Sequence, residues 1–212
     1  MKYISRITID KAIASRRGLH GLYNWHKEAW SLFPDRPKDK RNINFHFLTR
    51  LESDEQEFRL TILSDIEPQK PDWCFDGSFL VKEIPATFFT QKKYLFQVLA
   101  NPTKTLSNRD PKGNKKKHGS HYAITKPDEI REWFLRKAEQ SGFRTLDVPQ
   151  LDIGKPIFYK LHKKEHEGTI IGVEFKGGLE VIKKENFLKV VREGIGRARG
   201  FGFGMLVLKP MA

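Results

Sequence analysis

Three residues within five positions have side chains that can move a proton beside a phosphate. They are Tyr23, His26 and Lys27, and they lie in a segment, 19–33, whose apolar residues recur at helical spacing. Residues three or four apart on a helix share a face, so the phenol and the imidazole would adjoin, with the cation at their flank. A phenol and an imidazole transfer protons, and a cation can hold a phosphate. The pattern is a candidate for acid–base chemistry on a phosphate.

The same histidine can also be read as part of the hydrophobic core. At about 100° per residue, His26 falls in the middle of an arc formed by Leu19, Leu22, Ala29, Trp30 and Phe33. An isolated histidine on an apolar face is usually a structural residue that is satisfied by a buried partner. Spacing alone leaves both interpretations open.

A second candidate site is a glycine-rich segment near the end of the sequence. Its eleven residues contain Arg197 and Arg199 together with five glycines: Gly194, Gly196, Gly200, Gly202 and Gly204. Glycine lets a backbone approach a ligand closely, and arginine supplies positive charge. A helix precedes these glycines and an apolar strand follows them, which is the reverse of a dinucleotide-binding fingerprint, so we expect no nucleotide cofactor. In the alternative interpretation Gly194 is only a helix C-cap, and the other glycines permit a tight turn from the helix into the following strand.

Positive charge is in excess and is concentrated in polar segments. The chain has 39 Lys and Arg against 26 Asp and Glu, a net charge of +13, which favours a polyanionic partner such as a nucleic acid. The candidate RNA-binding lysines lie around a predicted hairpin tip and a polar insert, 108–119: Lys160, Lys163, Lys164, Lys104, Lys115, Lys116 and Lys117. These segments can lie along a nucleic-acid backbone or can be solvated loops without a special role.

The composition argues against several other kinds of site. The single cysteine, Cys74, excludes an intrachain disulfide and a cysteine-based zinc site. His162 and His166 are four apart but fall in the predicted hairpin tip without an identifiable third ligand, so we expect no metal. Charges are interspersed from the first residues, and no run approaches the ~20 apolar residues of a membrane span. We therefore expect a cytoplasmic protein without a membrane partner.

The hydrophobic patterns predict an α+β protein whose element order is repeated. The first half has a strand, a helix, a hairpin, a connector and a strand, over 3–9, 19–33, 42–51 with 56–63, 65–76 and 79–81. The second half has strands at 93–105, 143–148, 157–161 with 169–175, 179–182 and 205–208, and helices at 126–141 and 186–193. The first half follows the order of a ferredoxin-like unit, and a new unit begins near residue 91.

Several short motifs follow one another along nearly the whole chain. They are Tyr23-x-x-His26, Trp30-x-Leu-Phe-Pro34, Leu99-Ala-Asn-Pro-Thr-Lys104, Gly142-Phe-Arg144, Val173-x-Phe175-x-Gly177, and Gly194-Ile-Gly196 through Gly202-x-Gly204. In this order and spacing the chain resembles the CasE-type CRISPR RNA-processing endoribonucleases of type I-E systems, within the RAMP superfamily. The insert 108–119 matches no motif of that family.

The resemblance implies a fold of two tandem ferredoxin-like (RRM-like) domains, here 1–90 and 91–212, with antiparallel sheets and helices on one face. It also implies an enzyme that cuts CRISPR repeat RNA on the 3′ side of a hairpin without a metal or another cofactor. The 2′-OH would attack, leaving 2′,3′-cyclic phosphate and 5′-OH ends. The enzyme would then stay on the mature guide RNA as a subunit of Cascade.

By motif position, the resemblance makes His26 the catalytic histidine and Tyr23 its companion. Lys27 occupies a place where similar sequences can have arginine, and a lysine there keeps the charge but lacks the bidentate fork. The hairpin around Lys160 to Lys164 corresponds to the element that grips the RNA stem. Which of His26 and Tyr23 is the acid and which is the base stays open.

Two other functions are compatible with the same residues. The chain could be a RAMP-type RNA-binding structural subunit that cuts nothing, with His26 as a buried structural histidine. It could also be a metal-dependent nuclease, whose activity would be lost in EDTA. Tyr23-x-x-His26 is the feature that favours the metal-free nuclease.

Overall fold

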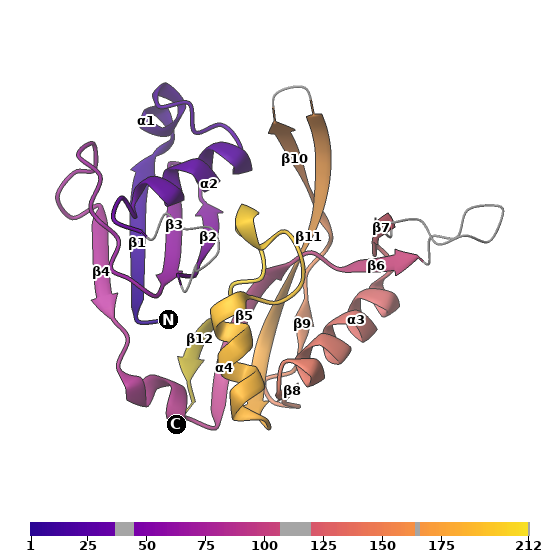
Figure 1. The fold of residues 1–212 in the computed structure, drawn as a ribbon. Coiled ribbons are helices and arrows are strands. Elements are labelled where there is room, and N and C mark those ends of the chain that lie inside the picture. Colours follow the sequence, from indigo (N-terminus) through magenta and orange to yellow (C-terminus); the bar gives the residue numbers. More distant parts are fainter. Residues whose placement is uncertain (37–44, 107–119, 164–165, 212) are drawn as a thin grey trace.

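The computed structural model describes residues 1–36, 45–106, 120–163 and 166–211, and in it each half of the chain builds its own sheet (Figure 1). The first sheet has the order β2-β3-β1-β4 and consists of β1 (Tyr3–Asp10), β2 (Phe47–Ser53), β3 (Glu57–Ser64) and β4 (Phe79–Glu83). The second has the path β10-β11-β5-β12 and consists of β5 (Lys93–Ala100), β10 (Ile157–Lys163), β11 (His166–Val181) and β12 (Val207–Pro210), with β8 (Phe143–Thr145) and β9 (Asp152–Ile153) paired to β11. A separate ribbon pairs β6 (Thr103–Leu106) with β7 (Ser120–Ala123).

The order of strands in both sheets is that of a ferredoxin-like fold. In the first sheet the fourth strand lies beside the first, then the third and the second follow. In the second sheet β12 lies beside β5, and β11 follows with β8, β9 and β10 on its far side. The strand pairs in both sheets are antiparallel. The predicted α+β class and the tandem ferredoxin-like arrangement are therefore confirmed.

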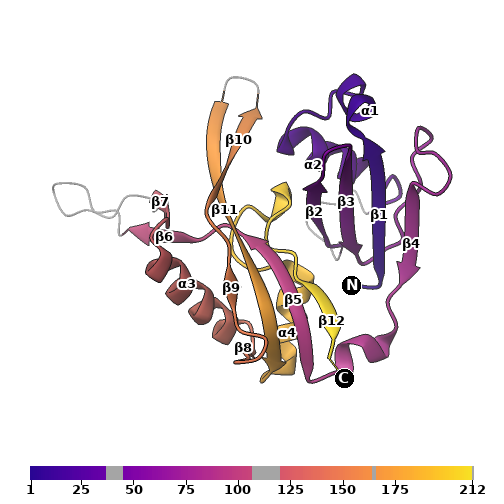
Figure 2. The same cartoon turned by 180° about the vertical axis from the view of Figure 1, so that it is seen from behind.

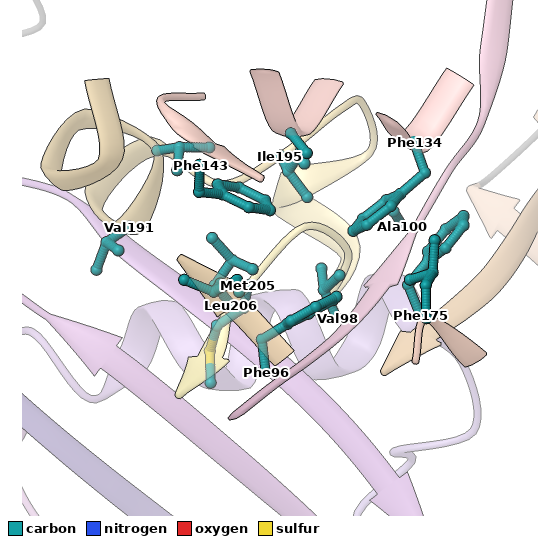
Figure 3. Packing of buried hydrophobic residues seen from close by; sticks show 14 of the residues in the cluster. Phe96, Val98, Ala100, Phe134, Phe143, Phe175, Val191, Ile195, Met205 and Leu206 are labelled. Carbon is teal, nitrogen blue, oxygen red and sulfur yellow. The ribbon is translucent and has the colours of Figure 1, made fainter. Parts of the chain in front are cut away.

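Helices cover one face of each sheet. They are α1 (Lys11–Arg16) and α2 (Leu22–Ser31) in the first half, and α3 (Pro127–Gln140) and α4 (Lys184–Glu193) in the second, with short 3-10 turns η1 (Ala86–Thr90) and η2 (Arg199–Phe201). Beneath α2, Trp25 and Ala29 pack with Ile7 of β1. Beneath α3, the ring of Phe134 stacks on Phe175 of β11 with centroids 4.2 Å apart (Figure 3). The division predicted at residues 90 and 91 falls between η1 and β5 and stays a prediction.

The hydrophobic core of the second half also contains residues of the first half. Leu48 of β2 and Leu63 of β3 are buried in the same cluster as Ile195, Met205 and Leu206, three residues that lie together in the close view (Figure 3). Seen from behind, β12 and β5 face toward the first sheet (Figure 2). The segment after α4 is therefore packed against both sheets.

The first helical region differs from its prediction in three respects. The sequence pattern missed α1, which begins after Asp10 because that carboxylate accepts hydrogen bonds from the backbone of Ala12 and Ile13, at 2.8 and 3.1 Å. Helix α2 begins at Leu22 instead of position 19. Its buried face centres on Trp25 and Ala29, so the prediction that His26 lies in the middle of the apolar arc is wrong. His26 is half-buried at the edge of that face.

The second half also departs from the predicted strands. The strand predicted through 105 ends at Ala100, because Pro102 has no backbone N–H to donate and Asn101 turns its side-chain amide to the carbonyl of Ile171 at 2.7 Å. The strand predicted to reach 148 ends at Thr145. The strands predicted at 169–175 and 179–182 are one continuous strand, β11. The whole predicted insert, 108–119, and positions 42–44 of the first hairpin lie outside the described residues.

Candidate functional site

His26 lies where α2 meets the glycine-rich segment. The turn η2 contacts both α2 and β2, and in the ribbon the yellow segment reaches up between the two sheets toward α2 (Figure 1). The ring centroids of His26 and Phe201 are 5.7 Å apart. A Cβ placed on Gly200 would lie 3.5 Å from Cε1 of His26. The imidazole of His26 thus packs directly against the glycine-rich segment.

Both nitrogens of the His26 ring have hydrogen-bond partners. The indole Nε1 of Trp30 donates to Nε2 of His26 at 3.0 Å. The backbone of Gly200 also hydrogen-bonds the ring and favours its protonated form, as a carbonyl acceptor does. Because Nε2 is an acceptor, the nitrogen that donates to this carbonyl is Nδ1.

Trp30 is itself held in place from two sides. Its ring meets Phe47 edge-on with centroids 4.8 Å apart. On another side the guanidinium of Arg36 lies 4.9 Å from the ring centroid and donates to the carbonyl oxygens of Trp30 and Phe33 at 3.1 and 2.9 Å. The indole N–H therefore has a defined direction toward His26.

A cleft of about 350 Å³ opens beside this pair. It is lined by residues of α2, by the segment leading into β2, by the end of α4 and by η2: His26, Trp30, His46, Arg192, Glu193 and Arg199 among them. Arg192 donates to Oδ2 of Asp65 through Nε and Nη2 at 3.2 and 3.0 Å. Arg199 donates to the carbonyl of Glu193 at 2.8 Å. Two guanidinium groups thus share one cleft with the imidazole.

The pKa of His26 is lowered from its usual value of 6.5. Burial is the main cause, because a half-buried ring loses hydration of its charged form, and the Gly200 carbonyl acts in the opposite direction. At neutral pH the ring is neutral, with a proton on one nitrogen and a lone pair on the other. A neutral imidazole can accept a proton, as a general base must.

Of Tyr23, His26 and Lys27, which were predicted to act together, two pair with each other and His26 pairs with a residue outside the three. Lys27 is exposed, and its Nζ lies 5.3 Å from the centroid of the Tyr23 ring. His26 instead pairs with Trp30. Neither Tyr23 nor Lys27 lines the cleft beside His26. Tyr23 lies one helical turn before His26, so a substrate that contacts both must extend along α2 toward its N-terminus.

Most of the glycines are required by the backbone of the loop itself. Gly194, Gly196, Gly202 and Gly204 have φ values of 80°, 79°, 89° and 82°, a region that disfavours other residues. A Cβ on Gly204 would lie 2.4 Å from the carbonyl oxygen of Ile195. Gly194 is also the C-cap of α4, as the structural interpretation expected. Gly200 differs, because it faces His26.

The candidate RNA-binding cations have different surroundings. Lys160 is exposed on β10 and lines a groove of about 610 Å³ between the start of α2 and the second sheet. Arg197 is also exposed. Lys104 pairs with Oε2 of Glu129 at 2.9 Å. Lys163 belongs to β10, but its side chain, Lys164 and Lys115, Lys116 and Lys117 lie outside the described residues.

Two other kinds of feature are absent from the described residues. In that part of the chain no three His, Cys, Asp or Glu side chains gather where they could hold a metal ion. None of its helices is both long and apolar enough to cross a lipid bilayer.

Several residues of the cleft were absent from the predicted site, among them Trp30, Arg192 and His46. Trp30 was assigned to the apolar arc, although its position four residues after His26 places it one turn away and could have suggested a contact. Arg192 and His46 lie far from His26 in the sequence, so no local pattern connects them to it. Only the packing of α4 and β2 around the glycine-rich segment brings them together.

Comparisons with known proteins agree on the kind of protein that this chain is similar to. The sequence model of a family described as CRISPR associated protein matches residues 2–210. The CRISPR-associated endoribonuclease Cse3 of Thermus thermophilus is 29% identical over 155 residues, which are 66% of this chain and 69% of that protein. The Cascade subunit CasE of Escherichia coli is 27% identical over 207 residues, 96% of this chain and 99% of that protein. A structure of Thermus thermophilus Cse3 bound to an RNA representing a pre-cleavage complex superposes with a TM-score of 0.75, at 25% identity and over 99% of both chains.

Proposed function

The chain belongs to the CRISPR-associated protein family, and from this premise we propose that it is a CasE-type endoribonuclease that processes CRISPR repeat RNA. The enzyme binds the hairpin of the repeat and cleaves at its 3′ base. It requires no metal and remains on the mature guide RNA as a subunit of Cascade. The names of its relatives, an endoribonuclease and a Cascade subunit, support both parts of the proposal.

The proposed reaction uses a nucleophile that the RNA supplies. The 2′-oxygen loses its proton and forms a bond to phosphorus, and the bond from phosphorus to the 5′-oxygen breaks. The departing 5′-oxygen takes up a proton, which leaves a 2′,3′-cyclic phosphate and a 5′-OH. His26 and Tyr23 transfer these protons, and Lys27 offsets the charge that gathers on the phosphorane.

One observation carries this proposal: His26 is half-buried, neutral and adjacent to a cleft that contains Arg192 and Arg199. A sealed structural histidine would have no such access. A phosphate in the cleft would meet two guanidinium groups, which bind its oxygens strongly. Lys160 on the hairpin and Arg197 on the loop extend the positive surface for the rest of the RNA.

Incubation of the protein with an end-labelled repeat RNA in EDTA tests the proposal. We expect one cut at the 3′ base of the hairpin, with a 2′,3′-cyclic phosphate on the upstream fragment. His26→Ala should remove cleavage and keep the RNA affinity of the unsubstituted protein. Loss of the cut in EDTA would point to a metal-dependent nuclease, and cleavage by His26→Ala at the normal rate would refute the role of His26.

A second function is favoured by the bond between Trp30 and His26. This contact occupies Nε2, as a structural hydrogen bond would, and it fits a RAMP-type subunit that binds guide RNA without cutting it. In the same assay such a subunit would bind the hairpin tightly and leave it intact, with or without EDTA.

A further inference from the structure

The partner of Nε2 in His26 can only donate a hydrogen bond. An indole nitrogen carries one hydrogen and has no lone pair available as an acceptor. Trp30 therefore requires a lone pair on Nε2, at the 3.0 Å distance observed. In the neutral ring the single proton must then be on Nδ1, and Gly200 provides the carbonyl that accepts it. The two contacts specify one tautomer.

We propose that Trp30 is a positioning residue for the reaction, which sets His26 as the neutral Nδ1–H tautomer and presents Nε2 as the basic nitrogen. This inference rests on the proposed function and assigns a direction to the proton transfer that the sequence left open. Trp30 does not contact the reacting atoms in this scheme. It acts through His26, whose orientation and protonation it fixes before RNA arrives.

The surroundings of Trp30 support a directed contact. Phe47 and Arg36 hold the indole on two sides, so in the RNA-free protein the N–H points at Nε2 of His26. The charged and titratable groups that line the cleft beside the ring are His46, before β2, Arg192 and Glu193, from α4, and Arg199, from η2.

The proposed proton transfer is balanced at each atom. When RNA binds, its 2′-OH takes the place of the indole N–H at Nε2. The 2′-proton moves to Nε2 as the 2′-oxygen bonds to phosphorus, and the ring becomes a cation. The Nδ1–H bond to Gly200 is retained and stabilises this cation. The acid that protonates the departing 5′-oxygen is then a different group, for which Tyr23 is the candidate.

The tautomer can be measured without any cleavage. Nitrogen-15 NMR of the imidazole in the RNA-free protein separates Nδ1–H from Nε2–H, with His26→Ala identifying the resonance. We expect wild-type His26 to be Nδ1–H. Trp30→Phe keeps an aromatic ring against Phe47 but has no N–H, so the share of Nδ1–H should fall and the pKa of His26 should rise.

Trp73→Phe is the matched control. The Trp73 indole also donates to α2, but its acceptor is Oε1 of Glu28 at 2.8 Å. Loss of that bond should leave the tautomer and the pKa of His26 unchanged. If both variants change the His26 resonance equally, the effect is a general loosening of α2 and the positioning role is wrong.

Single-turnover cleavage across pH then tests the consequence for the reaction. Trp30→Phe should slow cleavage about 2- to 10-fold, the range of one net hydrogen bond, and should move the acid limb of the rate profile to higher pH while RNA affinity stays constant. A wild-type Nε2–H tautomer, or an unchanged rate profile in Trp30→Phe, would overturn the inference. If wild type shows the Nδ1–H tautomer but never cuts RNA, the proposed function fails while the structural contact stands.

Discussion

Arg50 of β2 and Glu174 of β11 form an ion pair that connects the two sheets. Arg50 is 4% exposed, although it is a charged residue, and it also donates to Glu52 at 3.0 Å. Glu174 in turn accepts from Gln97 at 2.6 Å. Each half of the protein thus supplies one member of an ion pair that links the two sheets.

This pair predicts a stability that depends on pH. Burial acts to raise the pKa of Glu174, but hydrogen bonds from Lys176, Gln97 and Arg50 lower it to about 2 from 4.5. A carboxylate with a lowered pKa stabilises the fold above its usual pKa, and this contribution is lost as the pH falls from 4.5 toward 2. Glu174→Gln should lower the free energy of unfolding by about 1–3 kcal/mol at pH 7. Urea denaturation at pH 7 and pH 3 should show a smaller difference between variant and wild type at pH 3, and an equal difference would contradict the assignment.

His26 should titrate below the usual range of histidine. Because burial lowers its pKa, we expect an NMR titration midpoint under 6.5 in the RNA-free protein. The unfolded chain binds a proton at His26 more readily than the folded chain does, so acidification through pH 6.5 costs stability at this residue. A midpoint above 6.5 would show that the cleft favours the imidazolium.

Substitution by alanine should change the stability of the protein differently at two glycines of the same loop. In Gly204→Ala the new Cβ meets the Ile195 carbonyl at 2.4 Å, and the residue keeps a φ of 82°. We expect the free energy of unfolding to fall by at least about 1–3 kcal/mol. In Gly200→Ala the nearest neighbour is Cε1 of His26 at 3.5 Å, and stability should change by about 0.5 kcal/mol or less. Similar losses in thermal or urea unfolding would disprove this difference.

The salt dependence of RNA binding should distinguish Lys160 from Lys104. Lys160 is exposed on β10, whereas the charge of Lys104 is already paired with Glu129. If Lys160 contacts a phosphate, Lys160→Ala should reduce the slope of log K against log salt by about 1. Lys104→Ala should reduce it less. Filter binding of a repeat hairpin between low and moderate salt measures both slopes, and equal slopes for wild type and Lys160→Ala would exclude that contact.

The sequence predicted strands and helices best where one periodic pattern decides the structure. Strand β5 begins at its predicted residue, 93, because apolar and polar residues alternate along it through residue 100, although the prediction continued the strand to 105. Helix α1 was missed because its start depends on a cap by Asp10 and its six residues are too short to show a period. The pattern also placed His26 in the middle of the apolar arc, since it gave Leu19 and Phe33 to the helix when both lie outside its ends.

The site could be predicted only in part, because its members are brought together by tertiary packing. His26 and the glycine-rich segment were each identified from local composition. Their contact, and the arrival of Arg192 and His46 at the same cleft, depend on how α4 and η2 pack against β2. The pairing of Trp30 with His26 depends on which face of α2 is buried, and that face was predicted about one residue away from its observed position.

Because Gly200 and Phe201 lie against His26, the order of synthesis determines when the surroundings of this imidazole are complete. The ribosome makes α2 early and the turn that touches it long afterwards. A nascent chain that has folded its first sheet still has an imidazole without the carbonyl that orients it. Translation therefore completes the surroundings of His26 late, and a chain released before the glycines would lack the turn that packs against the imidazole.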